Sequence, residues 1–183
     1  MKWKNPLAAI GLVTFGLFAV TLAFADSKSE VDAGVSKALI QFYALNAKNK
    51  DLADKAVGML IFPHITKGGA GVAGEYGEGV LQVKGETVDY YNIESASIGF
   101  TLGIGSRSEI VMFMTRKALE SFKSSRGWKV GVDAGVAVVS MGAGGQYDTK
   151  TLQKPILGFV FGEKGLIGDL SLEGSKISMM DMK

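Results

Sequence analysis

Two glycine-rich apolar segments, far apart in the chain, constrain its fold more than any other feature. They are residues 55–80 (KAVGMLIFPHITKGGAGVAGEYGEGV) and 162–177 (GEKGLIGDLSLEGSKI). Glycine weakens a strand because it offers no side chain to pack, so a strand retains it where another backbone comes close. The chain has 25 glycines in 183 residues, which is about twice the average share. The simplest prediction is a tightly curved sheet or sheet-on-sheet packing, and a ligand groove is the second.

Alternation of apolar with small residues predicts the strands. In residues 96–106 the apolar side chains share one face and Ser, Gly and Thr share the other, and residues 130–138 repeat this arrangement. A buried strand is expected at 59–62, closed by Pro63. Further strands are expected at about 70–83, 87–92, 109–114, 155–161, 165–172 and 176–180.

Helical periodicity appears mainly near the N-terminus. Residues 26–47 predict an amphipathic helix with Glu30, Lys37 and Gln41 facing outward, and its apolar face comprises Val31, Val35, Ala38, Leu39, Phe42 and Leu45. Asn49 can cap a second short helix that runs through Lys55. We expect these helices to cover one end of the sheet, while membrane insertion of the first is the alternative.

One domain accommodates all of these elements, because no repeat, composition break or long polar linker divides the chain. A further short helix is expected near 116–124. The predicted fold is α+β, with a single, predominantly antiparallel, strongly curved or barrel-like sheet, N-terminal amphipathic helices and one further short helix.

The first 25 residues have the form of a secretory signal peptide. Lys2 and Lys4 precede an apolar run from Leu7 to Ala23, and Ala23-Phe24-Ala25 fits an A-x-A cleavage site. The mature domain would then span residues 26–183 and be periplasmic. An uncleaved membrane anchor is the alternative.

The charge balance bears on the class of binding partner, and the cysteine content bears on how the domain is stabilised. The chain carries 20 Lys and Arg against 18 Asp and Glu. Because the leader holds two of the basic residues and none of the acidic ones, the remaining side chains balance, and nucleic-acid binding loses its compositional support. The chain contains no cysteine, so the domain must be stabilised by core burial without disulfides.

The sequence offers little for catalysis. Residues 69–74 match the G-x-G-x-x-G fingerprint, but a strand pattern follows where a dinucleotide site needs a helix. His64 is the only histidine and lies most simply in a turn. Glu75 and Glu78 are three apart on a predicted strand, so they face opposite ways. We expect no enzyme, metal or cofactor, and a small hydrolase that uses His64 is the weakest alternative.

One basic cluster stands out between Arg107 and Lys129. It contains all three arginines of the chain, and Trp128 lies between cations in a glycine-containing loop. Arginine can bind phosphate oxygens bidentately, and tryptophan favours the headgroup boundary of a bilayer. The candidate lipid-headgroup residues are therefore Arg116, Lys117, Lys123, Arg126 and Lys129 for phosphate and Trp128 for interfacial insertion. The alternative is a solvated helix face beside a core-packed tryptophan.

Ordered blocks across about residues 47–177 resemble the SYLF-domain family. These blocks are Lys55-Ala56-x-Gly58, Ile61-Phe62-Pro63, Lys67-Gly68-Gly69, Gly74-Glu75-Tyr76-Gly77-Glu78-Gly79-Val80, Ser97-Ile98-Gly99, Lys164-Gly165-Leu166 and Leu170-Ser171-Leu172-Glu173-Gly174-Ser175. The resemblance implies binding of acidic lipids through basic residues and an amphipathic helix, and regulation of actin in eukaryotic members. For an exported bacterial member, we do not expect actin as a partner.

Two classes of function remain after these arguments. The first is a non-enzymatic module that docks on anionic phospholipid headgroups in the bacterial cell envelope. The second is a structural or protein-interaction module of the periplasm, in which the glycine-lined sheet face or the 26–47 helix binds an envelope partner. A transmembrane β-barrel is a weaker alternative, because the strands show no clear aromatic girdles.

Overall fold

Two unusually long strands dominate the structure, a computed structural model that describes residues 27–125, 127–130, 135–140, 151–165 and 174–182. Strand β1 (Gly58–Val83) and strand β2 (Glu86–Phe113) pair antiparallel along their whole length, from Gly58 opposite Phe113 to Val83 opposite Glu86. Lys84 and Gly85 connect them with φ of 55° and 83°, the positive values that a two-residue hairpin turn requires.

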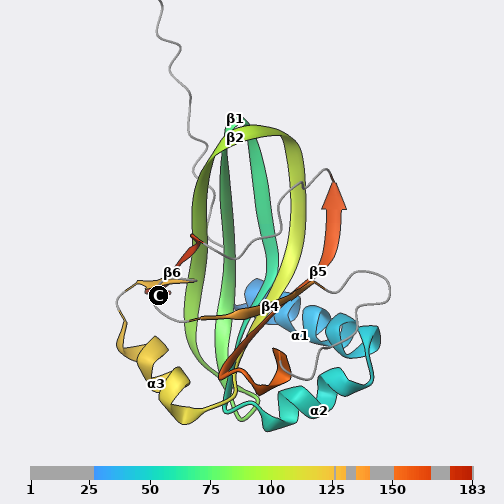
Figure 1. Cartoon of the computed structure of the whole chain (residues 1–183), viewed down its shortest axis with the longest axis vertical. Coiled ribbons are helices and arrows are strands. Elements are labelled where there is room, and N and C mark those ends of the chain that lie inside the picture. Colours follow the sequence, from blue (N-terminus) through green and yellow to red (C-terminus); the bar gives the residue numbers. More distant parts are fainter. Residues whose placement is uncertain (1–26, 126, 131–134, 141–150, 166–173, 183) are drawn as a thin grey trace, which may run out of the picture.

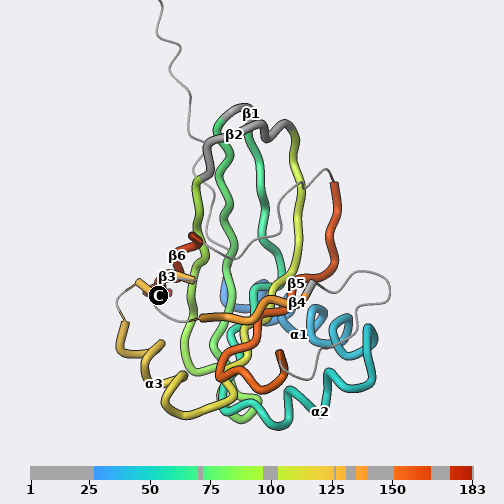
Figure 2. The backbone as a smooth tube through the Cα atoms, in the orientation of Figure 1, coloured from blue at the N-terminus to red at the C-terminus, as the bar shows by residue number. Residues whose placement is uncertain are grey.

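This long hairpin is folded over on itself. Its register shifts between Ala70 and Val72. Figure 1 shows both strands bending at one end of the molecule, and Figure 2 shows their coloured limbs running side by side below that end. The two halves of β1 then approach closely. A Cβ on Gly79 would lie 2.2 Å from the carbonyl oxygen of Ile61, and one on Gly77 would lie 2.7 Å from Cγ1 of Ile65. Glycine in this segment therefore permits the tight curvature that the sequence predicted.

The remaining strands complete a curled, mixed sheet on the other edge of β2. Strand β5 (Ile156–Gly165) pairs antiparallel with the C-terminal half of β2, and β6 (Lys176–Met179) pairs with its N-terminal half. The short strand β3 (Trp128–Lys129) extends the sheet beside β6, and β4 (Ala137–Ser140) lies parallel to β5. The six-stranded sheet has the order β3-β6-β2-β5-β4, with β1 paired to β2.

Helices pack on this sheet at the end opposite the bend (Figure 1). Helix α1 (Lys28–Leu45) and helix α2 (Lys48–Lys55) precede the hairpin, helix α3 (Arg116–Ser124) follows β2, and a 3-10 turn, η1 (Thr151–Gln153), precedes β5. In α1, Val31, Val35, Ala38 and Phe42 are buried. Within the described part of the chain, no helix combines the length and apolar character needed to cross a bilayer.

Two hydrophobic clusters lie on opposite faces of the sheet, because successive strand residues point to opposite sides. One cluster joins α1 and α2 to residues such as Ile61, Ile110 and Phe159. The other surrounds α3 and includes Leu60, Phe62, Phe113, Phe122 and Trp128. The predicted α+β fold with a single strongly curved, mostly antiparallel sheet is confirmed.

Several local predictions need correction. The strand at 59–62 does not end at Pro63, because β1 bulges there and continues. Asn49 does not cap α2. It lies buried inside that helix and donates its side-chain amide to the carbonyl of Phe42 at 2.6 Å. Leu45, assigned to the apolar face of α1, is 43% exposed, and Ile40 is 71% exposed.

Some predicted features fall outside the described residues. They are the leader at 1–25, Arg126, residues 131–134 of the strand expected at 130–138, and nearly all of the strand expected at 165–172. Three strands expected at 87–92, 96–106 and 109–114 are parts of the single strand β2. The predicted strand at 176–180 is confirmed as β6, and that at 155–161 as part of β5.

Candidate functional site

Helix α3 brings three of the candidate headgroup residues to one exposed surface. Thr115 caps the helix by accepting a hydrogen bond from the backbone N–H of Ala118 at 3.3 Å, and Phe122 anchors the opposite face in the core. Arg116 and Lys123 are seven residues apart, so they share a side of the helix, and Lys117 lies one step around from Arg116. All three are exposed. We call Arg116, Lys117 and Lys123 the basic face of α3.

Glu120 moderates the charge of this surface. It is exposed and lies four residues after Arg116 and three before Lys123, a spacing that places it on the same side of the helix. The described part of the surface therefore carries three positive charges and one negative charge. A net positive, solvated helix face of this kind attracts anionic groups mainly through long-range, salt-sensitive electrostatics.

Trp128 does not belong to the exposed surface, and the prediction that it inserts into a bilayer is wrong for this fold. Its side chain is 2% exposed. Its ring centroid lies 5.4 Å from that of Phe122 in an edge-to-face arrangement and 6.2 Å from that of Phe113. The alternative stated from sequence, a core-packed tryptophan, describes its position. Trp128 connects the short strand β3 to the buried side of α3.

Lys129 follows Trp128 and faces outward, because neighbouring strand residues alternate. It pairs in register with Lys176 of β6, whose Nζ lies 3.4 Å from Oε1 of Glu94. Lys129 is exposed. It therefore lies on the outer surface of the sheet, whereas Arg126 lies outside the described residues.

Arg107, the first residue of the basic cluster, is not on the surface either. Its side chain is fully buried between two carboxylates, with Nε 2.6 Å from Oε1 of Glu109 and Nη2 2.7 Å from Oε2 of Glu75. Glu75 also pairs with Lys67, whose Nζ lies 3.0 Å from Oε1. We call Lys67, Glu75, Arg107 and Glu109 the buried charge cluster. It joins the two halves of the folded hairpin.

The pKa values of the two carboxyl groups in this cluster shift in opposite directions. Burial raises the pKa of Glu109 to about 7, and Arg107 opposes this effect only in part. Burial also acts to raise the pKa of Glu75, but hydrogen bonds and charges from Arg107 and Lys67 outweigh it and lower that pKa below the ordinary value. The difference has a structural cause. Both oxygens of Glu75 meet cations, whereas Oε2 of Glu109 has no hydrogen-bond partner among the described residues.

Sequence reasoning missed the buried charge cluster, although one signal was present. Arg107 and Glu109 are two residues apart, at the junction of the strands expected at 96–106 and 109–114, and a continuous strand there would place both on the same face. No local pattern connects them with Glu75, which lies 32 residues earlier than Arg107. Only the folding of the hairpin brings these groups together.

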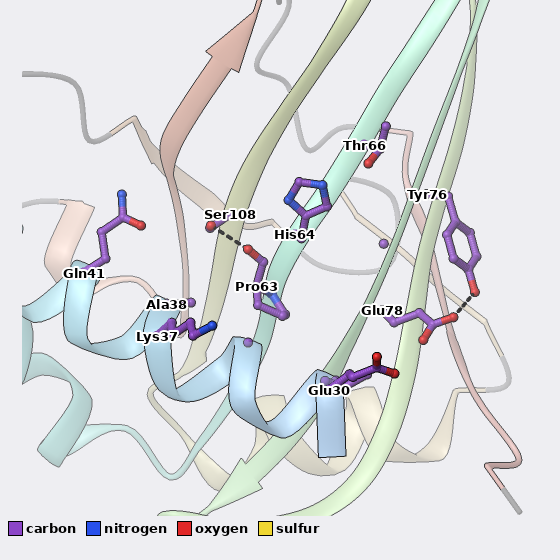
Figure 3. Close-up of a pocket in the computed structure, with 13 residues that line it drawn as sticks. Glu30, Lys37, Ala38, Gln41, Pro63, His64, Thr66, Tyr76, Glu78 and Ser108 are labelled. Atoms are coloured by element: carbon purple, nitrogen blue, oxygen red, sulfur yellow. Dashed lines mark hydrogen bonds between the residues drawn. The ribbon is translucent and has the colours of Figure 1, made fainter. Parts of the chain in front are cut away.

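A groove of about 410 Å³ runs between α1 and both halves of the bent strand β1 (Figure 3). Lys37 of α1 and His64, Tyr76 and Glu78 of the sheet contribute to its walls. The Tyr76 hydroxyl donates to Oε1 of Glu78 at 2.8 Å, and the Ser108 hydroxyl donates to the Pro63 carbonyl at 2.8 Å. His64 is exposed on the β1 bulge, where the sequence favoured a turn. Across the described residues, no three His, Asp or Glu side chains are grouped to hold a metal ion.

The structure thus combines a curled mixed sheet, helices on both of its faces and an exposed basic helix, α3. Residues 94–182 match the family model Ysc84, described as "Las17-binding protein actin regulator". This match, over slightly less than half of the chain, confirms the resemblance to the SYLF-domain family in residues 94–182. The blocks before residue 94 lie outside the matched range. No curated protein matches the chain significantly.

Proposed function

We propose that this protein is a non-enzymatic module that docks on anionic phospholipid headgroups at the surface of a membrane in the bacterial envelope. The observation that carries the proposal is the basic face of α3, where Arg116, Lys117 and Lys123 share an exposed surface. A helix anchored by Phe122 on one side and basic on the other can present phosphate-binding groups without disturbing the core. The resemblance of residues 94–182 to the SYLF-domain family, which implies binding of acidic lipids, supports the same function.

The binding mode differs from interfacial insertion of an aromatic residue. Trp128 is buried, so the proposed contact is electrostatic. Each basic residue near an anionic surface contributes about 1 kcal/mol, so three contribute about 3 kcal/mol, or about 100-fold in affinity. Arg126, which lies outside the described residues, stays a further candidate, whereas Lys129 points to the side of the sheet opposite Trp128 and α3. Because screening shortens the range of such attraction, high salt should remove the binding.

Co-sedimentation with vesicles tests the proposal. The protein is isolated from the envelope fraction, and its intact mass reports whether the chain begins at Asp26, as the proposed export and cleavage of residues 1–25 require. Binding to vesicles containing phosphatidylglycerol, and none to phosphatidylcholine vesicles, is expected at low salt. The variant Arg116→Gln/Lys117→Gln/Lys123→Gln should weaken this binding about 100-fold with an unchanged melting temperature.

A matched control removes the same charge elsewhere. Lys28→Gln/Lys37→Gln/Lys48→Gln replaces three exposed lysines on α1 and α2, which lie away from α3 in Figure 1. This control should retain most of the binding. Equal loss in both triple variants would show a response to net charge alone and would remove α3 as the docking surface.

A second candidate function has its own observation. Ile40 and Leu45 are large apolar residues exposed on α1, at 71% and 43%. Exposed apolar residues on one helix suit a protein partner in the envelope. If the protein binds neither type of vesicle but Ile40→Ser abolishes a stoichiometric complex isolated by crosslinking in cells, the interaction module is the better description.

A further inference from the structure

The groove between α1 and the bent strand β1 adjoins a second cavity of about 420 Å³. Residues 106–108 of β2 and 162–164 of β5 form part of the walls of this second cavity. The residues that line both cavities are Gln41, Pro63, His64 and Ser108. They meet where β1 bulges, because Pro63 and His64 together oppose Ser108, and bulges occur often beside functional sites. We call the two adjoining cavities the α1 trough.

One side of α1 forms a wall of this trough and gives it length. The wall residues recur every three or four positions, the spacing of a single side of a helix, and they are Glu30, Val31, Gly34, Lys37, Ala38 and Gln41. At about 1.5 Å per residue, the stretch from Glu30 to Gln41 spans about 16 Å. The second cavity continues beyond Gln41. A trough of this length suits a ligand made of several linked units better than a single small molecule.

The exposed charges along the trough balance. Glu30 and Glu163 carry negative charges, and Lys37 and Lys164 carry positive charges, and all four side chains are exposed. Because neither sign dominates, the trough has no strong field to select an anion or a cation. Uncharged groups that can donate and accept hydrogen bonds are provided by Gln41, Thr66 and Ser106. This mixture of donors and acceptors favours a neutral ligand with many hydroxyl groups.

Tyr76 adds an aromatic surface at one end of the trough. Figure 3 shows Tyr76 and Gln41 at opposite ends of the first cavity. Tyr76 is 40% exposed, and its hydroxyl donates to Oε1 of Glu78 at 2.8 Å. This hydrogen bond fixes the direction of the ring, so less freedom is lost when a ligand binds. An aromatic ring offers an apolar face beside a polar edge, which matches the C–H face and hydroxyl edge of a sugar ring.

We propose that the α1 trough binds a neutral oligosaccharide, with Tyr76 stacking on a sugar ring at one end and Gln41 and Thr66 binding hydroxyl groups along the wall. An oligosaccharide is a chain of units, carries no charge and has rings that are apolar on one face and polar at the edge. The trough lies on the α1 side of the sheet, whereas α3 packs on the other side. The site therefore does not depend on the proposed docking function.

Isothermal titration calorimetry of the purified protein tests the site. The probes are two neutral tetrasaccharides, chitotetraose and maltotetraose, and their monomers, N-acetylglucosamine and glucose. At least one tetrasaccharide should bind, and its monomer should bind at least tenfold more weakly, because a monomer fills only part of the trough. Since the ligand is neutral, raising the salt concentration should leave the affinity unchanged, unlike vesicle binding through α3.

Variants of the trough locate the binding. Tyr76→Ala removes the ring and should weaken tetrasaccharide binding about tenfold, whereas Tyr76→Phe retains the ring and should bind within about threefold of the parent. Gln41→Ala changes an exposed side chain, so the protein should fold, and it should weaken binding several-fold. Gln153→Ala, at an exposed glutamine of η1 outside the trough, is the matched control and should bind as the parent does.

The outcomes separate this site from the alternatives. Loss of binding in Tyr76→Ala and Gln41→Ala, with binding retained in Tyr76→Phe and Gln153→Ala, supports the proposal. No binding of either tetrasaccharide, or binding that neither Tyr76→Ala nor Gln41→Ala weakens, overturns it. Equal loss in Tyr76→Ala and Tyr76→Phe would overturn the stacking role of the ring. The α3 triple variant should bind the tetrasaccharide as the parent does, so failure of one proposal is distinguishable from failure of the other.

Discussion

Replacing Glu109 by glutamine should change how the stability of this protein depends on pH. Glu109 is fully buried, its Oε1 accepts from Nε of Arg107 at 2.6 Å, and its Oε2 has no hydrogen-bond partner among the described residues. Burial raises its pKa from an ordinary value of 4.5 to about 7. Glutamine has nearly the same shape and can still accept from Arg107, but it cannot ionise. The substitution therefore removes the titration and preserves the packing.

The sign and size follow from proton linkage. Between pH 4.5 and about 7, the unfolded chain has released this proton while the folded protein retains it, so the free energy of unfolding falls as pH rises. At about 1.4 kcal/mol per pKa unit, the shift to about 7 corresponds to a loss of about 3 kcal/mol, complete by about pH 8. Glu75 has a lowered pKa, so it acts in the opposite direction and at lower pH, where stability is lost as its carboxylate becomes protonated.

Urea unfolding of the parent protein and of Glu109→Gln at pH 4.5, 6 and 8 measures this effect. The stability of the parent relative to the variant should fall by about 3 kcal/mol across the series. Glu86→Gln, an exposed position at the start of β2, is the control and should follow the parent. A difference between parent and Glu109→Gln that stays constant within about 1 kcal/mol would refute the reasoning, because Glu109 would then be ionised throughout.

Two further predictions concern glycine packing and the tryptophan. Gly79→Ala places a Cβ 2.2 Å from the Ile61 carbonyl oxygen and should destabilise the protein by about 3 kcal/mol. Gly74→Ala, whose nearest contact is at 4.0 Å, should be neutral or stabilising in thermal unfolding. Equal melting temperatures of the two variants would contradict the close approach at Gly79. In a Trp3→Phe background, Trp128 fluorescence should be blue-shifted and unchanged by anionic vesicles, because the ring is buried. Trp128→Ala should lower the free energy of unfolding in urea by about 3–5 kcal/mol. A change in Trp128 emission on vesicle binding would contradict a buried ring.

Much of the fold could be predicted because its signals are local. Helical spacing of Val31, Val35, Ala38 and Phe42 correctly indicated the buried side of α1, and the short helix at 116–124 was confirmed as α3. The strands expected within β1 and β2 were also correct, but Ile104, on the apolar face expected at 96–106, is 75% exposed. The predicted strand ends were wrong where a strand continues past a residue that usually ends strands. Pro63 has no N–H to donate to a sheet, so it predicts the end of a strand. It lies in a bulge of β1, where this donor is not needed for the hydrogen-bonded ladder, and β1 continues beyond it.

The candidate site was less accessible from sequence, since charge alone does not report exposure. Arg107 and Arg116 looked equivalent members of one basic cluster. Arg107 became the centre of buried ion pairs, whereas Arg116 remained on an exposed helix face. Trp128 likewise had two sequence interpretations, and its contact with Phe122 decided between them.

The sequence by itself determined most of the helices and strands and most of the buried face of α1, because periods of two and of about 3.6 residues are set by backbone geometry within each segment. The glycines also indicated either a tightly curved sheet or sheet-on-sheet packing, since glycine permits two backbones to come close. Only the tertiary structure decided which charges are buried together. Lys67, Glu75, Arg107 and Glu109 interact because the hairpin folds back on itself. Their ionisation depends on burial and on distances between distant parts of the chain, which no local pattern encodes.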